Sequence, residues 1–181
     1  MSTLAVHAGA RPDPVTGARG TPIYQTTSFV FDDAEHGAEL FNLQTFGYVY
    51  SRMTNPTVSV FEERVAQLEG GRGAVATSSG HAAQFIAAAT LMEAGDEFIA
   101  SRNLYGGSVT QFGVSFPKLG WKCNFVDPTD PANFEKAMND KVKFIFCEGV
   151  ANPGGIILDL EKIADIAHKH GVLLIVDNTL A

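Results

Sequence analysis

The sequence predicts an α/β fold with a mainly parallel sheet flanked by helices, preceded by an extended N-terminal arm. Two observations support this prediction. From about residue 74 onward, short strand-like runs that are apolar on both faces alternate with helix-like segments, as in sheets covered by helices on both sides. Before residue 55 the chain has many turn-forming residues and little periodicity. We therefore expect an arm over residues 1–55 and an α/β domain over residues 56–181.

The arm contains the turn-forming stretches RPDP, TG, RGTP and FG, and we expect one short helix in it, near Glu35 to Leu43. A segment of this kind cannot bury itself. It should lie either on its own domain or on a partner subunit, and the second arrangement implies an oligomer.

The first long helix is expected directly after the arm. Asn55 is a favourable N-cap, Pro56 suits the first helical position, and Phe61, Val65 and Leu68 recur with helical spacing. Gly70 and Gly71 then end the helix.

An alternation of strands and helices follows. The last helix can be capped by Asp159 and ended by Gly171. In parallel sheets with helical crossovers, ligands bind beyond the carboxyl ends of the strands. The expected strands are 74–77, 97–100, 122–126, 142–147 and 172–176, and the expected helices are 81–92, one within 107–119, 133–138 and 160–170.

Composition narrows the function classes. The 181 residues are 45% hydrophobic and include 13 Lys+Arg against 20 Asp+Glu, a net charge of −7 without a basic cluster, which argues against nucleic-acid and membrane partners. The first residues do not resemble a secretory signal, and no apolar run reaches about 18 residues, so we expect a cytoplasmic protein. Cys123 and Cys147 lie in expected strands, without metal-ligand spacing, and are predicted to be buried thiols. No metal site is expected.

A candidate phosphate site follows the expected strand 74–77. Ser79, Gly80 and His81 form a small-residue turn into a helix, where free amides and a hydroxyl can bind a phosphate. The alternative is that these residues only cap the helix. A GxGxxA match over residues 71–76 is not a dinucleotide fingerprint, because it follows a helix and leads into a strand.

Three further residues follow the expected strands. Tyr105 is either a surface tyrosine or an aromatic ring at the ligand-binding edge, and Asn152 lies in an NPGG turn that offers an amide side chain. Asp177 ends an apolar strand, so its carboxylate needs donors or a cation. A helix cap or an internal salt bridge is the ordinary explanation. A pyridine nitrogen that must stay protonated is the alternative partner.

Tyr50 and Arg52 form a Tyr-x-Arg pair in the arm. In extended chain their side chains point the same way, which suits a shared grip on one phosphate. The alternative is a surface arginine beside an aromatic ring.

The order of the motifs YSRMTNPT, SSGHAAQ, LYGGS, NPGG and VDNT resembles the pyridoxal-phosphate-dependent enzymes of cysteine and methionine metabolism, which have fold type I of that cofactor class. The resemblance runs from Val6 to Ala181. Within that family the stretch 41–44, the histidine of SSGHAAQ and the NPGG turn are most similar to O-acetylhomoserine sulfhydrylases. Residues 56–181 would then be the first part of the pyridoxal-phosphate-binding large domain.

The resemblance also implies roles for the candidate residues in binding pyridoxal 5'-phosphate. Tyr50 and Arg52 would reach the cofactor phosphate of a neighbouring subunit in a homotetramer. Within one subunit, the turn at Ser79 with the amides of Gly80 and His81 would hold the phosphate, Tyr105 would stack on the ring and assist catalysis, Asn152 would bind the ring's 3' oxygen, and Asp177 would pair with the ring nitrogen, with Thr179 close by.

The implied reaction converts O-acetyl-L-homoserine and sulfide or a thiol to homocysteine or methionine and acetate. None of the lysines here follows the family's Schiff-base lysine motif, so we expect residues 1–181 to be an N-terminal fragment with an incomplete large domain that is inactive alone. Cystathionine γ-synthase, O-succinylhomoserine sulfhydrylase and methionine γ-lyase are alternative reactions. A non-catalytic dimerising or regulatory remnant of the fold is the alternative from another class.

Overall fold

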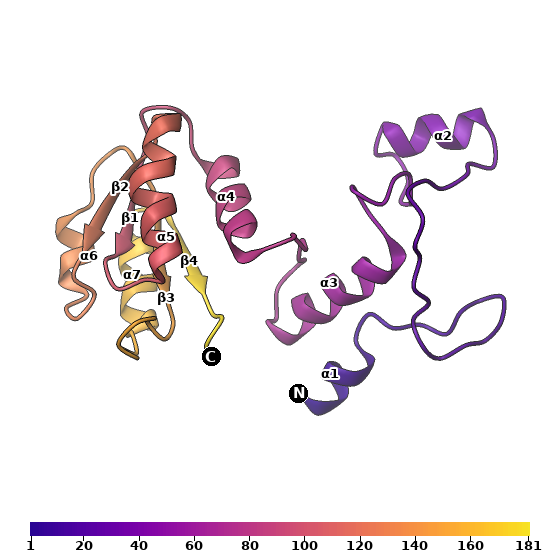
Figure 1. Cartoon of the computed structure of the whole chain (residues 1–181), viewed down its shortest axis with the longest axis horizontal. Coiled ribbons are helices and arrows are strands. Elements are labelled where there is room, and N and C mark those ends of the chain that lie inside the picture. The colour runs from indigo at the N-terminus through magenta and orange to yellow at the C-terminus, as the bar shows by residue number, and fades with distance from the viewer. The chain divides into compact units, whose positions relative to one another are not determined.

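The computed structural model describes residues 1–181 and consists of two compact units. We call Met1–Thr77 the N-terminal unit and Ser78–Ala181 the sheet unit. Figure 1 labels the helices and strands of both.

The N-terminal unit is helical and extended, with a single isolated β-bridge between Ser28 and Tyr50. One of its helices begins as expected, since the Asn55 side chain accepts a hydrogen bond from the N–H of Thr57 and proline occupies the first helical position. Phe61 on the expected apolar stripe is 58% exposed. The helices are α1 (Ser2–His7), which the sequence analysis did not predict, α2 (Ala34–Phe41) and α3 (Pro56–Leu68).

The sheet unit contains four parallel strands in the order β2-β1-β3-β4, which confirms the predicted α/β class with a parallel sheet. The strands are β1 (Glu97–Ser101), β2 (Lys122–Val126), β3 (Val142–Glu148) and β4 (Leu173–Asp177). The helices are α4 (Gly80–Leu91), α5 (Gly106–Thr110) continued by the π turn η1 (Gln111–Ser115) and the 3₁₀ turn η2 (Phe116–Leu119), α6 (Ala132–Lys136) and α7 (Leu160–Lys169).

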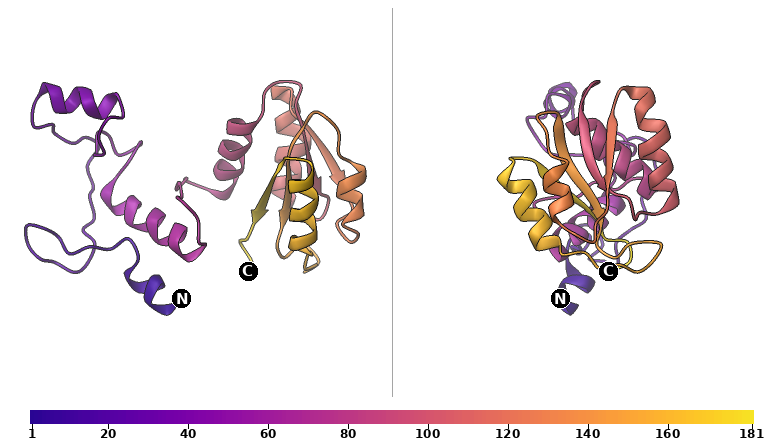
Figure 2. Two further views of the ribbon diagram at one scale, coloured as in Figure 1. Left: turned by 180° about the vertical axis from the view of Figure 1, so that it is seen from behind. Right: turned by 90° about the vertical axis from the view of Figure 1, so that its left-hand side faces the viewer.

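Helices cover both faces of the sheet because its central strands are apolar on both sides. Phe98 and Phe144 face one side, where they pack with residues of α4 and the α5–η2 run. Ile99 and Ile145 face the other, where they pack with residues of α6 and α7. The right-hand view of Figure 2 shows α5 and α7 on opposite sides of the strands.

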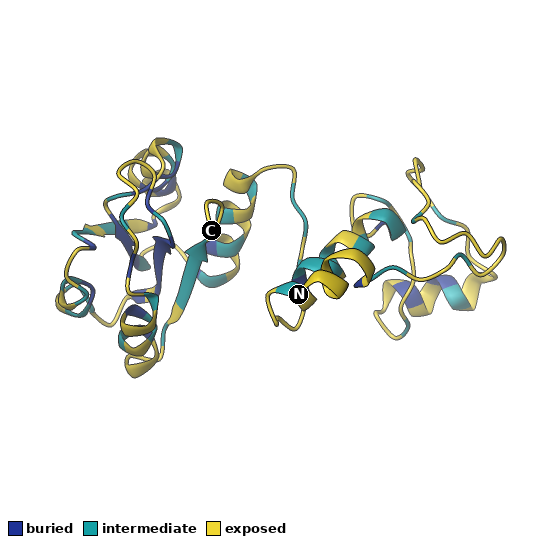
Figure 3. Cartoon of the chain, turned by 90° about the horizontal axis from the view of Figure 1, so that it is seen from below, coloured by how far each residue is buried: buried dark blue, intermediate teal, exposed yellow.

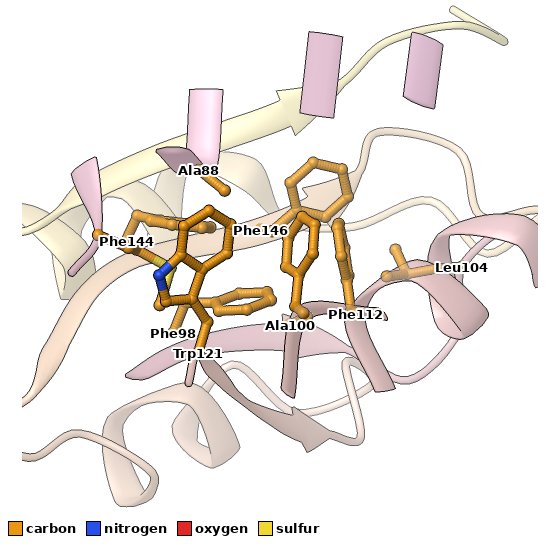
Figure 4. Packing of buried hydrophobic residues seen from close by; sticks show 10 residues of the cluster. Ala88, Phe98, Ala100, Leu104, Phe112, Trp121, Phe144 and Phe146 are labelled. Carbon is orange, nitrogen blue, oxygen red and sulfur yellow. The ribbon is translucent and has the colours of Figure 1, made fainter. Parts of the chain in front are cut away.

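An aromatic cluster forms the core on the α4 and α5 side (Figure 4). Phe98 stacks on Phe144 with ring centroids 4.7 Å apart, and the ring of Phe112 meets Phe98 edge-on at 5.1 Å. Edge-on and offset contacts of this kind add to the stabilisation from burial. This packing fixes β1 and β3 relative to each other, and with them the position of their carboxyl ends.

The predicted strand at residues 74–77 is wrong, since these residues have no regular structure. A strand needs a neighbour that takes up its backbone hydrogen bonds. The four strands of the sheet pair only with one another, and the segment lies at the end of the N-terminal unit, where no such neighbour is present.

Burial is concentrated in the sheet unit. In Figure 3 the central strands are dark blue and much of the N-terminal unit is yellow. Cys147 is fully buried, and this burial raises the pKa of its thiol to about 12, while Cys123 is only partly buried. None of the helices combines the length and the apolar character of a membrane-spanning segment. No group of three or more His, Cys, Asp or Glu side chains is placed to hold a metal ion.

Candidate functional site

A cavity of about 350 Å³ lies at the carboxyl edge of the sheet, and all of its lining belongs to the sheet unit. Ligand sites in parallel α/β sheets are found at this edge. The lining residues come from the first turns of α4, the loop after β1 with α5, the end of β3 with the loop after it, and the end of β4 with the residues after it: Gly80, His81, Gln84, Tyr105, Ser108, Glu148, Val150, Asn152, Asp177, Thr179 and Leu180.

The start of α4 forms one wall of the cavity. The side chain of Ser79 is the N-cap and accepts a hydrogen bond of 3.1 Å from the N–H of Ala82. The first amides of a helix have no partner within the helix and favour an anion. A methyl group added at Gly80 would meet no atom within 4 Å, so the space in front of the helix start is open. Gly80 and His81 therefore line the cavity, and Ser79 caps the helix beside it.

Asp177 ends β4 and faces the cavity. Its Oδ1 accepts hydrogen bonds from the N–H (3.1 Å) and the hydroxyl (2.5 Å) of Thr179, and its Oδ2 accepts one from Nε2 of Gln84 at 3.3 Å. It forms no ion pair with a lysine or arginine, so the internal salt bridge considered from the sequence is not present. The carboxylate is oriented by neutral donors alone.

Gln84 was missed by the sequence analysis. It lies one helical turn after Gly80, so the helix start and the side chain that touches Asp177 share one face of α4, about 6 Å apart along the axis. Its Nε2 also donates to the hydroxyl of Ser108 at 2.9 Å. Its Oε1 is buried without a partner, which leaves an unsatisfied acceptor at the cavity wall.

Tyr105 follows β1 and is 52% exposed. Its ring centroid lies 5.8 Å from that of His81, with the planes tilted by 42°. Gly107 makes this packing possible, because a methyl group there would lie 2.6 Å from atoms of both rings. The aromatic side chain thus stands at the edge of the cavity, beside the start of α4.

Glu148, the last residue of β3, was not proposed as a site residue from the sequence. It is 5% exposed, and its two carboxylate oxygens accept hydrogen bonds of 2.7 Å from the backbone N–H groups of Tyr105 and Asn152. The available signal was its position, because it ends an apolar run as Asp177 does. With Asp177 it gives the cavity two carboxylates, and no lysine or arginine lines it.

Tyr50 and Arg52 lie in the N-terminal unit. The expectation of extended chain at this pair is wrong, because the N–H groups of Met53 and Thr54 bond back to the carbonyl of Tyr50 and form a turn. The side chains are nevertheless adjacent, since Cζ of Arg52 lies 5.2 Å from the centre of the Tyr50 ring, within the range of a cation–π contact. The turn brings the guanidinium of Arg52 next to the aromatic ring of Tyr50.

Comparisons with known proteins match almost the whole of this chain. The profile of the family described as Cys/Met metabolism PLP-dependent enzyme matches residues 2–181. An O-acetyl-L-homoserine sulfhydrylase of Leptospira meyeri is 49% identical over 178 residues, which are 98% of this chain and 40% of that protein.

Solved structures extend the likeness to the fold. A Campylobacter jejuni protein assigned as an O-acetylhomoserine (thiol)-lyase, in which a lysine carries a pyridoxyl phosphate, superposes with a TM-score of 0.94 at 38% identity over 97% of this chain and 43% of that one. A cystathionine γ-lyase of Lactobacillus plantarum, solved with L-serine, gives 0.87 at 33% identity over 97% and 44%. The chain therefore has fold type I, and it spans about 40% of the length of the first curated relative.

Proposed function

This chain belongs to the Cys/Met metabolism PLP-dependent enzymes, and from that premise we propose that the protein is an O-acetylhomoserine sulfhydrylase. The proposed reaction joins O-acetyl-L-homoserine and sulfide to give homocysteine and acetate, or uses a thiol to give the corresponding thioether, in methionine biosynthesis. The observation that carries the proposal is the cavity at the carboxyl edge, where a helix start and two carboxylates without a cation meet.

The donor set of the cavity suits pyridoxal 5'-phosphate. The start of α4 favours an anionic phosphate, while Asp177 and Glu148 favour a positively charged group such as a protonated ring nitrogen. Tyr105 offers an aromatic face, and Gln84 offers a buried acceptor without a partner. One turn of α4 connects the helix start at Gly80 with Gln84, which binds Asp177.

Each candidate residue is then proposed to have a specific role. The amides of Gly80 and His81 bind the phosphate, with Ser79 holding the helix start in place. Asp177 keeps a proton on the ring nitrogen, and Thr179 and Gln84 hold its carboxylate in position.

Tyr105 and Asn152 act on the ring itself, since both line the cavity. Tyr105 would lie against the ring face and act as the catalytic residue of this chain, and Asn152 would bind the 3' oxygen. When bound, pyridoxal phosphate supplies an electron sink for carbanion chemistry, and the protein supplies orientation and charge. The small-molecule amino acid is the substrate that this chemistry requires.

Tyr50 and Arg52 are proposed to bind the cofactor phosphate of a neighbouring subunit in a homotetramer with shared active sites. The proximity of the Arg52 guanidinium to the Tyr50 side chain supports a shared grip on one phosphate. Residues 1–55 are proposed as the arm that reaches the neighbour, residues 56–181 as the first part of the large domain, and the cytoplasm as the location.

The activity test uses protein expressed from the complete reading frame. Purified protein is assayed for homocysteine with sulfide and either O-acetyl- or O-succinyl-homoserine, for cystathionine with cysteine as acceptor, and for methanethiol with methionine as substrate. We expect turnover with the acetyl ester and sulfide. A clear preference for the succinyl ester, for cysteine as acceptor, or for methionine cleavage would replace the proposal by O-succinylhomoserine sulfhydrylase, cystathionine γ-synthase or methionine γ-lyase, respectively.

A non-catalytic dimerising or regulatory role is the second candidate for residues 1–181 taken alone. It is favoured by one observation, the absence of a lysine among the residues that line the cavity. We expect this chain to bind pyridoxal phosphate without forming a covalent bond. Intact-mass measurement after borohydride reduction, with a 420 nm absorbance scan, tests this, and a reduced covalent adduct on a lysine of this chain would contradict it.

A further inference from the structure

Glu148 stands at the centre of the carboxyl edge, at the end of β3 between β1 and β4. Its Oε1 accepts a hydrogen bond from the N–H of Tyr105, 43 residues earlier, and its Oε2 accepts one from the N–H of Asn152, both at 2.7 Å. Each oxygen of one buried carboxylate thus binds a different loop of the cavity. These loops carry two of the residues proposed to contact the cofactor ring.

Other hydrogen bonds connect these loops elsewhere. The loop after β1 is bound to β2 through the N–H of Arg102 and the carbonyl of Val126 at 2.8 Å. The loop after β3 is bound to β4 through the N–H of Gly149 and the carbonyl of Asp177 at 3.1 Å. Glu148 is therefore the side chain that joins the two loops to each other through β3.

We propose that Glu148 is a positioning residue that sets Tyr105 and Asn152 relative to each other before the cofactor binds. The role assigned to the two loops rests on the proposed function, whereas the joining of the loops rests on the two hydrogen bonds alone. A carboxylate suits this position because it offers two acceptors to two N–H donors. A glutamine offers one acceptor, and its amino group would face the second donor.

The burial of this charge is informative. A buried carboxylate is costly unless its oxygens are compensated, and hydrogen bonds to a charged acceptor are the strong ones. Glu148 has only 5% of its surface exposed and no lysine or arginine partner. An apolar side chain would fill the end of β3 at lower cost, but it could not hold both loops.

The test compares Glu148→Gln with Glu97→Gln in the protein from the complete reading frame. Glu97 is also a hydrogen-bonded glutamate, but it is the first residue of β1 and lies at the amino edge of the same sheet. Amide hydrogen exchange is measured by NMR at Tyr105 and Asn152, together with thermal unfolding. We expect Glu148→Gln to speed exchange at one or both amides by about tenfold or more, as for the loss of a charge-assisted hydrogen bond. Glu97→Gln should leave both rates unchanged.

Cofactor affinity is measured in parallel on the same two variants of the protein from the complete reading frame, with pyridoxal 5'-phosphate as the probe. We expect Glu148→Gln to bind the cofactor about tenfold more weakly than the wild type, and Glu97→Gln to bind it with unchanged affinity. Glu148→Asp, which keeps both acceptors but is shorter by one methylene, provides a second variant and should speed exchange at one of the two amides.

The outcomes separate the two proposals. Unchanged exchange at Tyr105 and Asn152 in Glu148→Gln, or in Glu148→Asp if the first variant does not fold, would overturn the positioning role. Equal losses of cofactor affinity in Glu148→Gln and Glu97→Gln would also overturn it, because general destabilisation would then suffice. A wild-type protein that binds no pyridoxal phosphate would contradict the proposed function, and the exchange rates would still decide the role of Glu148.

Discussion

The amino and carboxyl edges of the sheet, where the parallel strands begin and end, differ in the partners of their carboxylates. At the amino edge, Glu97 accepts hydrogen bonds from the side-chain amides of Asn124 (2.7 Å) and Asn139 (3.1 Å) and pairs with the ammonium of Lys122 at 3.2 Å. These donors, the Asn124 amide foremost, lower the pKa of Glu97 from 4.5 to about 2. The charge at this edge is compensated within the protein.

At the carboxyl edge, Glu148 and Asp177 are held by backbone N–H groups, a hydroxyl and a side-chain amide, without a lysine or arginine. At the amino edge the carboxylate has a cationic partner within the protein. At the carboxyl edge the two carboxylates face a cavity that has no lysine or arginine in its lining. The difference indicates that the first edge serves stability, and that the second is arranged for a ligand that brings its own positive charge.

The strongest test of this comparison is Asp177→Ala in the protein from the complete reading frame. Because the alanine cannot keep a proton on the ring nitrogen, we expect the turnover number to fall by about a thousandfold or more. Steady-state kinetics with saturating pyridoxal phosphate measures the loss. Glu97→Gln is the matched control from the other edge and should keep a near-normal turnover number. Wild-type turnover in Asp177→Ala would remove the role assigned to this residue.

Gly107→Ala tests the packing of the aromatic wall at the carboxyl edge. A methyl group there would lie 2.6 Å from the rings of His81 and Tyr105, so at least one ring must move. We expect cofactor affinity to fall about tenfold or more, whereas stability should change by less than about 1 kcal/mol, because both rings are exposed and can move.

Gly106→Ala is the control for this substitution, because a methyl group at that neighbouring position would meet no atom within 4 Å. Fluorescence titration with pyridoxal phosphate and thermal unfolding compare the two variants. Equal effects of Gly106→Ala and Gly107→Ala would show that ring packing is not what the cavity requires.

The sequence predicted most of the sheet unit because its strands and helices are local patterns. The runs at 122–126 and 142–147 form β2 and β3 almost residue for residue, and the helix over 160–170 forms α7. The run at 74–77 failed because a strand depends on a neighbour, which a local pattern does not describe.

The candidate site also contains residues that the sequence predicted and residues that it did not. Asp177 and Gly80 could be found because they follow or begin a regular element, and parallel topology brings such positions to one edge. The position of Glu148 at the end of an apolar run was visible in the same way, but its two hydrogen-bond partners were not, and Gln84 was missed because its partner Asp177 lies 93 residues away along the chain. Which buried polar side chain meets which distant donor is decided by packing, so periodicity alone does not reveal it.

Glu97→Gln tests the charge compensation at the amino edge. The variant loses the charge that Asn124, Asn139 and Lys122 stabilise, and we expect the free energy of unfolding at pH 7 to fall by about 2 kcal/mol with unchanged cofactor affinity. Because the folded pKa of about 2 lies below 4.5, the wild-type contribution is complete above pH 4.5 and is lost as the pH falls toward 2.

Urea unfolding of the wild type and Glu97→Gln between pH 7 and pH 2 measures this dependence. The stability difference between the two proteins should narrow below pH 4.5 and be smallest near pH 2. A difference that stays constant over this range would mean that the glutamate contributes through packing and not through its charge.

The smallest effect is expected for Arg102→Ala, which removes an exposed cation just beyond β1 at the carboxyl edge. Arg102 pairs with Asp127, but the pKa of Asp127 is lowered first by hydrogen bonds from the hydroxyl and N–H of Thr129 and only then by the guanidinium. Exposed pairs contribute little to stability, so the melting temperature should change by less than about 2 °C. Arg102 does not line the cavity, and cofactor affinity at physiological salt should change by less than about twofold. A larger change in affinity, reduced by added salt, would show that cations beyond the cavity wall set its charge, and the contrast between the two edges would then have to be drawn over a wider surface.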